Sequence, residues 1–207
     1  MSQDVKWLFF DVGSTLVDES LVYENRMRYI AQTINVTYEY IYKSALKFYK
    51  RNQKGDLELF KLYNLEELEW NCDEEKLYVD TKEWLKKLKC KYKIGIIANQ
   101  SFGTTERLEN FGILKYIDLV IASAEEGVAK PNKKIFEIAL NKSGCEPNQA
   151  IMIGDRIDND IVPAKALGMK TIWVKQGFRQ YWNVQGEDES ADLVVDNLTE
   201  IVAFLYK

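Results

Sequence analysis

The chain has 207 residues, of which 28 are basic and 32 acidic, so its formal net charge is −4, and it contains no histidine. A chain of this length buries enough apolar surface to fold without disulfides or a structural metal, and its mixed charges form no basic surface for nucleic acid or an anionic membrane. Without histidine, Ser-His-Asp and Cys-His catalysis are excluded, so acid–base chemistry must come from carboxylates, lysines or water.

The cysteines and the N-terminus indicate a cytoplasmic protein. The three cysteines, Cys72, Cys90 and Cys145, are an odd number without metal-ligand spacing, which favours free thiols in a reducing compartment. The first residues are polar and run directly into an expected strand, and no long apolar segment follows. We therefore expect no membrane or nucleic-acid partner, while the oligomeric state is not predictable.

Six short segments rich in Val, Ile and aromatic residues are typical of strands buried on both faces. They are residues 7–12, 94–98, 119–122, 150–153, 171–174 and 193–195. Helical patterns lie between most of them, at residues 82–89, 105–111, 131–143 and 160–167. This alternation predicts an α/β fold, a Rossmann-like parallel sheet with helices on both faces, whose ligands bind at the carboxyl ends of the strands.

Residues 19–76 break the alternation and show only amphipathic helical patterns, at 21–34, 38–51 and 57–70. Thr37 and Asp56 are candidate N-caps of the second and third helices. We expect a small all-helical cap domain, inserted after the first strand and standing over its end, on a core made of residues 1–18 and 77–207. Tyrosines of this insertion could line a substrate cavity, but most have the helical spacing of ordinary packing residues.

Asp11 follows the first expected strand and precedes a turn that contains Gly13. A carboxylate in this position can act as a nucleophile if a cation and backbone N–H groups neutralise the group that it attacks. Asp and Gly are also common in turns without chemistry. This segment alone therefore leaves both interpretations open.

A second strand, in the sequence IMIGDRIDND of residues 151–160, also ends in carboxylates. If it lies beside the first strand, Asp11 and Asp155 meet, and two hard oxygen ligands suit Mg²⁺. Asn159 or Asp160 could instead cap the following helix. Both roles can hold together, with Asp160 as a cap or as a residue that orients the metal site.

Two further segments could contact an anionic substrate. Lys130 stands just before Pro131 and an expected helix, where its ammonium could pair with a phosphoryl oxygen and reduce the repulsion from Asp11. Asn99 follows the strand at residues 94–98, and its amide and the nearby N–H groups could hold phosphate oxygens. A solvated lysine and an ordinary turn are the alternatives.

In this order, the segments FFDVGSTL, IGIIANQ, GVAKPNKKIFEIAL and IMIGDRIDNDIVPAKALGM resemble the four motifs of the haloacid dehalogenase-like (HAD) superfamily, over nearly the whole chain. The helical insertion resembles the C1 cap of members that act on small molecules. By this resemblance Asp11 is the nucleophile, and Asp11, the Val12 carbonyl and Asp155 bind Mg²⁺. Lys130 would steady the nucleophile and the phosphate, and Asp160 would support the metal site.

Two phosphate-binding positions depart from the family pattern, while Asn99 and Lys130 keep it. Gly13 stands where the phosphatases of the family carry a second aspartate, and losing such an acid–base group costs about 10²–10⁴-fold in rate. Ala98 stands in place of a serine or threonine whose hydroxyl binds phosphate, a loss on the order of 1 kcal/mol. Ser101 and Asn99 are possible substitutes for that hydroxyl.

Three functions are therefore open. The first is a Mg²⁺-dependent phosphatase for a small phosphorylated metabolite, acting through an aspartyl-phosphate, with water, a cap carboxylate such as Glu19 or Glu24, or a good leaving group offsetting the missing acid. The second is a non-catalytic protein that binds a phosphorylated ligand or a partner. The third is a dehalogenase, which needs neither acid nor metal. The metal-type residues Asp155 and Asp160 favour phosphate chemistry.

Overall fold

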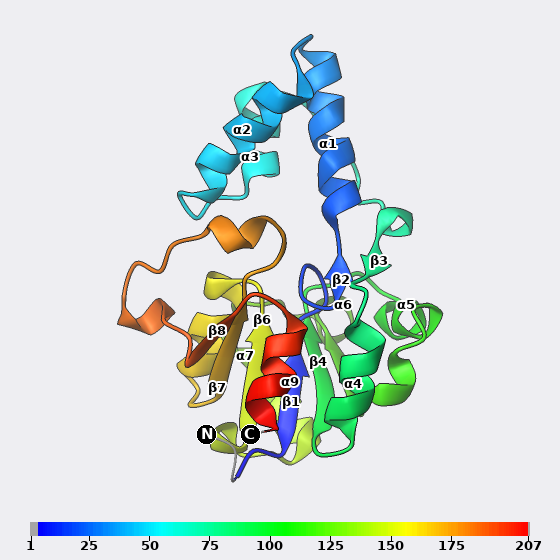
Figure 1. The fold of residues 1–207 in the computed structure, drawn as a ribbon, viewed down its shortest axis with the longest axis vertical. Helices are drawn as coiled ribbons and strands as arrows, with labels where there is room; N and C mark the ends of the chain where they lie inside the picture. The colour runs from blue at the N-terminus through cyan, green and yellow to red at the C-terminus, as the bar shows by residue number, and fades with distance from the viewer. Residues whose placement is uncertain (1–3, 207) are drawn as a thin grey trace.

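The computed structural model describes residues 4–206. Its core is a six-stranded sheet with the strand order β5-β4-β1-β6-β7-β8, in which every pair of neighbours is parallel (Figure 1). The strands are β1 (Trp7–Phe10), β4 (Lys93–Ala98), β5 (Leu119–Ala122), β6 (Ala150–Gly154), β7 (Lys170–Val174) and β8 (Leu193–Val195). The predicted fold class and all six predicted strands are confirmed.

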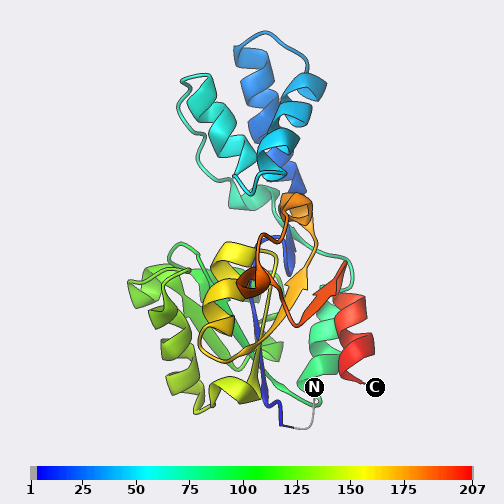
Figure 2. The same ribbon diagram turned by 90° about the vertical axis from the view of Figure 1, so that its left-hand side faces the viewer.

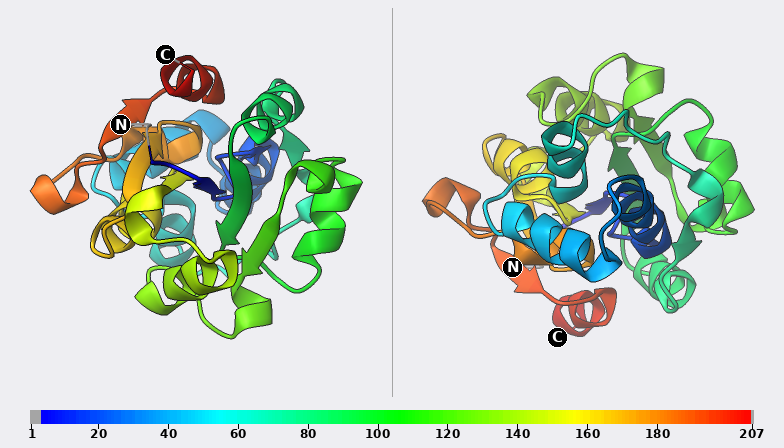
Figure 3. Two further views of the ribbon diagram at one scale, coloured as in Figure 1. Left: turned by 90° about the horizontal axis from the view of Figure 1, so that it is seen from below. Right: turned by 90° about the horizontal axis from the view of Figure 1, so that it is seen from above.

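Helices cover both faces of this sheet (Figures 2 and 3). On one face, α4 (Thr81–Lys89) and α9 (Leu198–Leu205) pack over a cluster that includes Leu8 and Phe10. On the other face, α7 (Lys133–Ser143) and α8 (Val162–Lys165) pack over a cluster that includes Phe9. Because successive side chains of a strand point to opposite faces, β1 has to be apolar at every position.

The remaining helices of the core are short. α5 (Thr104–Asn110) and the one-turn α6 (Ser123–Glu126) both contact β5 at the edge of the sheet. A π-helical turn, Ile157–Ile161, precedes α8, where the sequence predicts one helix over residues 160–167. Within the described range, no helix has the length and hydropathy needed to span a bilayer.

The helical insertion stands above the carboxyl ends of the strands (Figure 1). It consists of α1 (Ser20–Thr33), α2 (Tyr38–Tyr49) and α3 (Gly55–Leu62), and Thr37 caps α2 as predicted by accepting the N–H of Tyr40. Two short antiparallel strands, β2 (Val17–Asp18) and β3 (Lys76–Leu77), connect it to the core. Strands of two residues are too short to produce a periodic pattern in the sequence.

The third helix of the insertion differs from its prediction. It ends at Leu62 instead of residue 70, and its N-cap is Lys54. Asp56 lies in the first turn of α3 and is buried, where it accepts hydrogen bonds from Arg26 of α1 and from the Tyr49 hydroxyl of α2. The prediction of Asp56 as an N-cap was therefore wrong, because these tertiary contacts use both carboxylate oxygens.

A turn after β7, Gly177–Tyr181, reaches up beneath the insertion, in orange in Figure 1. The ring of Phe178 stacks on Tyr49 at a centroid distance of 4.8 Å and meets the edge of Tyr23 at 5.2 Å. This aromatic contact joins the insertion to the core in addition to β2 and β3.

Candidate active site

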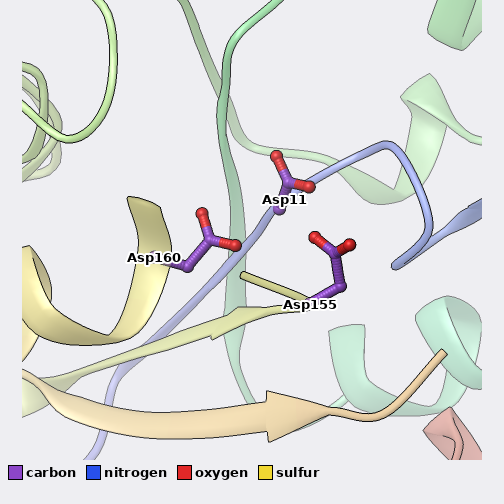
Figure 4. Close-up of side chains that lie close together, drawn as sticks. All are labelled: Asp11, Asp155 and Asp160. Atoms are coloured by element: carbon purple, nitrogen blue, oxygen red, sulfur yellow. The ribbon is translucent and has the colours of Figure 1, made fainter. Parts of the chain in front are cut away.

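Parallel pairing brings three buried carboxylates together at the carboxyl edge of the sheet (Figure 4). β1 pairs with β6 so that Phe10 is opposite Ile153, and Asp11 and Asp155 follow at the same edge. The π-helical turn after β6 contributes Asp160. Oxygen atoms from the three carboxylates lie within 4.8 Å of one another. The structure thus brings together the two aspartates that the sequence analysis singles out as metal ligands.

Lys130 connects two of these carboxylates. Its Nζ donates to Asp11 Oδ1 at 2.6 Å, to Asp160 Oδ1 at 2.6 Å and to the Ile97 carbonyl at 2.9 Å, and the residue is only 5% exposed. Burial lowers the pKa of Lys130, but the charges of Asp11 and Asp160 outweigh it, and the net shift is upward. Lys130 is therefore a cation that holds Asp11 in place.

Asn99 positions Lys130 from the end of β4. Its Oδ1 accepts the Lys130 N–H at 2.7 Å, and its Nδ2 donates to the Lys130 carbonyl at 2.9 Å. The amide that the sequence suggests for phosphate binding is thus engaged with the backbone of the lysine loop. Ala98 is fully buried and offers no polar side-chain atom, whereas Ser101 lines the same cavity as Asn99 and Lys130.

Asp160 links Lys130 to the backbone that follows β6. While Oδ1 binds Lys130, Oδ2 accepts the Arg156 N–H at 3.0 Å. A Cβ at Gly154 would lie 2.3 Å from Oδ2, so only glycine lets this carboxylate lie against the end of β6. Neither Asp160 nor Asn159 caps α8, whose N-cap is Ile161. That alternative is wrong, because both oxygens of Asp160 already have partners.

The Asp155 carboxylate has the environment of a cation ligand. It is 4% exposed, and among residues 4–206 no hydrogen bond or ion pair reaches it. Burial, followed by repulsion from Asp11 and Asp160, raises the pKa of Asp155 well above its ordinary value. A divalent cation would remove this repulsion, and carboxylate oxygens are the ligands that Mg²⁺ prefers. Asp11 and Asp155 therefore fit such an ion.

Comparisons with known proteins identify the family of this chain. The sequence model described as haloacid dehalogenase-like hydrolase matches residues 8–174. The chain belongs to this family. The resemblance of its four motifs is therefore confirmed.

Two curated relatives of this haloacid dehalogenase-like hydrolase are named as phosphate-ester hydrolases. Glyceraldehyde 3-phosphate phosphatase of Methanocaldococcus jannaschii is 35% identical over 53% of this chain and 47% of the relative. Pyrimidine 5'-nucleotidase YjjG of Escherichia coli is 38% identical over 56% of this chain and 50% of the relative. The chain thus spans about half the length of these curated relatives.

Solved structures share the whole fold. A HAD phosphatase from Thermococcus onnurineus has a TM-score of 0.65 and 24% identity, with 97% of this chain and 98% of that chain covered. A dehalogenase structure has a TM-score of 0.70 and 18% identity and is covered completely, as is this chain. Similarity at this level of identity establishes the fold of the haloacid dehalogenase-like hydrolase and no more.

The Val12 carbonyl of this haloacid dehalogenase-like hydrolase, which the sequence analysis predicts as a metal ligand, lies in the tight turn after Asp11. That oxygen accepts the N–H groups of Thr15, Leu16 and Val17 at 3.3, 2.9 and 3.0 Å, and Val12 is fully buried. The turn uses this oxygen for its own hydrogen bonds, and its role as a metal ligand stays a prediction. Gly13, in contrast, lines the cavity beside Asp11.

Glu19 fills the place of the side chain that Gly13 lacks. A Cβ at Gly13 would lie 2.2 Å from Glu19 Oε1, and Glu19 Oε2 accepts the Ser14 hydroxyl at 2.8 Å. Burial raises the pKa of Glu19 to about 8, against the effect of the Ser14 hydrogen bond. A carboxyl group that keeps its proton near neutral pH therefore stands where this family carries its second aspartate.

A cavity of about 450 Å³ lies between the carboxyl edge of the sheet and the insertion. Asp11, Lys130 and Asp155 line it from the core, and Lys54 and Arg179 line it at the side of the insertion and the turn after β7. The sequence analysis did not identify these last two residues. For Arg179 the only sequence signal was its place among the aromatic residues of 178–182, and this does not show where the side chain points.

Proposed function

We propose that this haloacid dehalogenase-like hydrolase is a Mg²⁺-dependent phosphatase for small phosphorylated metabolites, acting through an aspartyl-phosphate on Asp11. One observation carries the proposal: a buried lysine bridges Asp11 and Asp160 beside the unpaired carboxylate of Asp155. This arrangement combines a held nucleophile, a fixed positive charge and a place for a divalent cation. The phosphatase and nucleotidase names of the relatives support the same class of reaction.

In the proposed first step, Asp11 attacks phosphorus and the bond to the alcohol oxygen breaks. Lys130 holds Asp11 Oδ1, which leaves Oδ2 for the attack, and its charge reduces repulsion between the phosphate and the carboxylates. Asp160 keeps Lys130 in position. Asp11 and Asp155 would hold Mg²⁺, which when bound supplies neutralising charge for the phosphoryl oxygens.

Glu19 is the proposed proton donor and acceptor. With a pKa of about 8 it carries a proton at neutral pH, which it gives to the departing alcohol oxygen. As a carboxylate it then takes a proton from the water that hydrolyses the aspartyl-phosphate. Glu24 is a weaker candidate, because it lies on the exposed side of α1 and pairs there with Arg28.

Residues 19–76 are the proposed cap, and residues 1–18 and 77–207 the catalytic core. In this arrangement the insertion closes the cavity over Asp11 and excludes bulk water from the reacting phosphate. Specificity would then depend on the residues of the insertion and of the turn Gly177–Tyr181 that face the cavity.

The direct test compares Asp11→Asn with wild type in releasing phosphate from p-nitrophenyl phosphate. Activity should require Mg²⁺, disappear in a chelator and be lost in Asp11→Asn, but persist in Asp188→Asn, which changes an exposed aspartate. Equal turnover of Asp11→Asn and wild type would reject the proposal. Tight retention of a phosphorylated metabolite without turnover would favour a binding protein, and halide release from a 2-halo acid in a chelator a dehalogenase.

A further inference from the structure

We infer that Arg179 and Lys54 form a second anion-binding subsite in the catalytic cavity. The substrates that this enzyme prefers would then carry, besides the phosphate that is removed, a carboxylate or a second phosphoryl group. The inference rests on the proposed function and specifies its substrate class.

Arg179 is a buried cation with unused hydrogen-bond donors. It belongs to the turn that rises from β7 to the insertion, and it is 5% exposed. Its guanidinium carbon lies 5.1 Å from the centre of the Tyr49 ring and 5.3 Å from that of Trp182. Its Nε and Nη1 have no hydrogen-bond partner among residues 4–206. Buried guanidinium groups are normally paired, so these donors indicate an acceptor on a ligand.

A second cation lines the cavity beside Arg179. Lys54 lines the same cavity, and in the described part of the chain its ammonium has no ion pair. Burial lowers the pKa of Lys54, and the charges of Arg156 and Arg179 lower it further. Arg156 pairs with Asp158, and the buried Asp56 is already occupied by Arg26. Within residues 4–206 neither Lys54 nor Arg179 therefore forms an ion pair, although the charges of Asp155 and Asp56 also act on Arg179.

The subsite and the catalytic residues line one cavity. Asp11, Lys130 and Asp155 line the same 450 Å³ space as Lys54 and Arg179, so one small molecule can contact both groups. The planar donor fork of a guanidinium matches the paired oxygens of a carboxylate or a phosphoryl group. A phosphate ester without a second anionic group would leave the donors of Arg179 unpaired.

The test compares pairs of substrates that differ in one anionic group. 3-Phosphoglycerate and glycerol 3-phosphate differ in a carboxylate, and fructose 1,6-bisphosphate and fructose 6-phosphate in a phosphoryl group. In wild type, kcat/KM should be about tenfold or more higher for the member with the additional anionic group in at least one pair. Lys54→Met should reduce this preference about tenfold. Lys61→Met, which changes an exposed lysine of the helix α3 that follows Lys54, should retain it.

A folded Arg179→Lys variant provides a second measurement, because it keeps the positive charge but loses the paired donors of the guanidinium. Its ratio of kcat/KM within a substrate pair should lie between the ratios of wild type and Lys54→Met. Equal kcat/KM within both wild-type pairs, or equal losses for both members in Lys54→Met, would overturn the inference. If no ester is hydrolysed, the proposed function fails by itself. Calorimetry then decides the subsite: tighter binding of 3-phosphoglycerate than of glycerol 3-phosphate, weakened in Lys54→Met, supports it, and equal binding rejects it.

Discussion

Replacing Glu19 with glutamine keeps the size of the side chain and an acceptor for the Ser14 hydroxyl, but removes the proton beside Gly13. If Glu19 is the general acid and base, turnover of an alkyl phosphate should fall by about 10²–10⁴-fold, or about 3–5 kcal/mol in activation free energy. A p-nitrophenyl ester needs no proton to leave. The variant should therefore release about one equivalent of nitrophenol rapidly and then stall as the aspartyl-phosphate.

Rapid-quench measurement of nitrophenol and phosphate separates these two steps. The control moves the carboxyl group from position 19 to position 13. Gly13→Asp alone should not raise activity, because its Cβ would lie 2.2 Å from Glu19 Oε1. Combined with Glu19→Ala, the same aspartate has room and should recover turnover of the alkyl phosphate. Unchanged turnover of Glu19→Gln, or a gain from Gly13→Asp alone, would refute the assignment of Glu19.

Three other predictions concern pH, charge and packing. Because the pKa of Glu19 is raised from 4.5 to about 8, the folded state binds the Glu19 proton more tightly than the unfolded state does. In EDTA, the free energy of unfolding should therefore fall as the pH rises between these values. Denaturant titrations should show a weaker fall for Glu19→Gln, and an equal dependence of stability on pH in both proteins would contradict the shift. Lys130→Met removes the ion-pair partner of two buried carboxylates. Urea titration should show a free energy of unfolding lower by about 3–5 kcal/mol, and activity should be lost. Lys133→Met, which changes an exposed lysine, should alter neither stability nor activity. Gly154→Ala should lower the free energy of unfolding by about 1–3 kcal/mol and reduce turnover, because the new Cβ would lie 2.3 Å from Asp160 Oδ2. The control is Gly186→Ala, whose Cβ meets no atom within 4 Å. Equal thermal stability of the two variants would contradict this packing.

The positions of the strands were predictable because parallel strands buried on both faces are continuous apolar segments. The run before Asp11 and the run before Asp155 are both of this kind, so the sequence indicated two strand ends with carboxylates. The insertion was predicted less well. Asp56 has the local pattern of an N-cap, but Arg26 and Tyr49, which are distant in the sequence, decide its position.

The sequence by itself determined the fold class and the acidic residues that end the strands, since these depend on local hydrophobicity and on motif order. Only the tertiary structure decided which atoms are available for chemistry. It engages the Val12 carbonyl in a turn, fits Glu19 against Gly13 and buries Arg179 beneath the insertion with donors unpaired. These outcomes depend on the path of the backbone and on contacts between separate segments, which local sequence patterns do not encode.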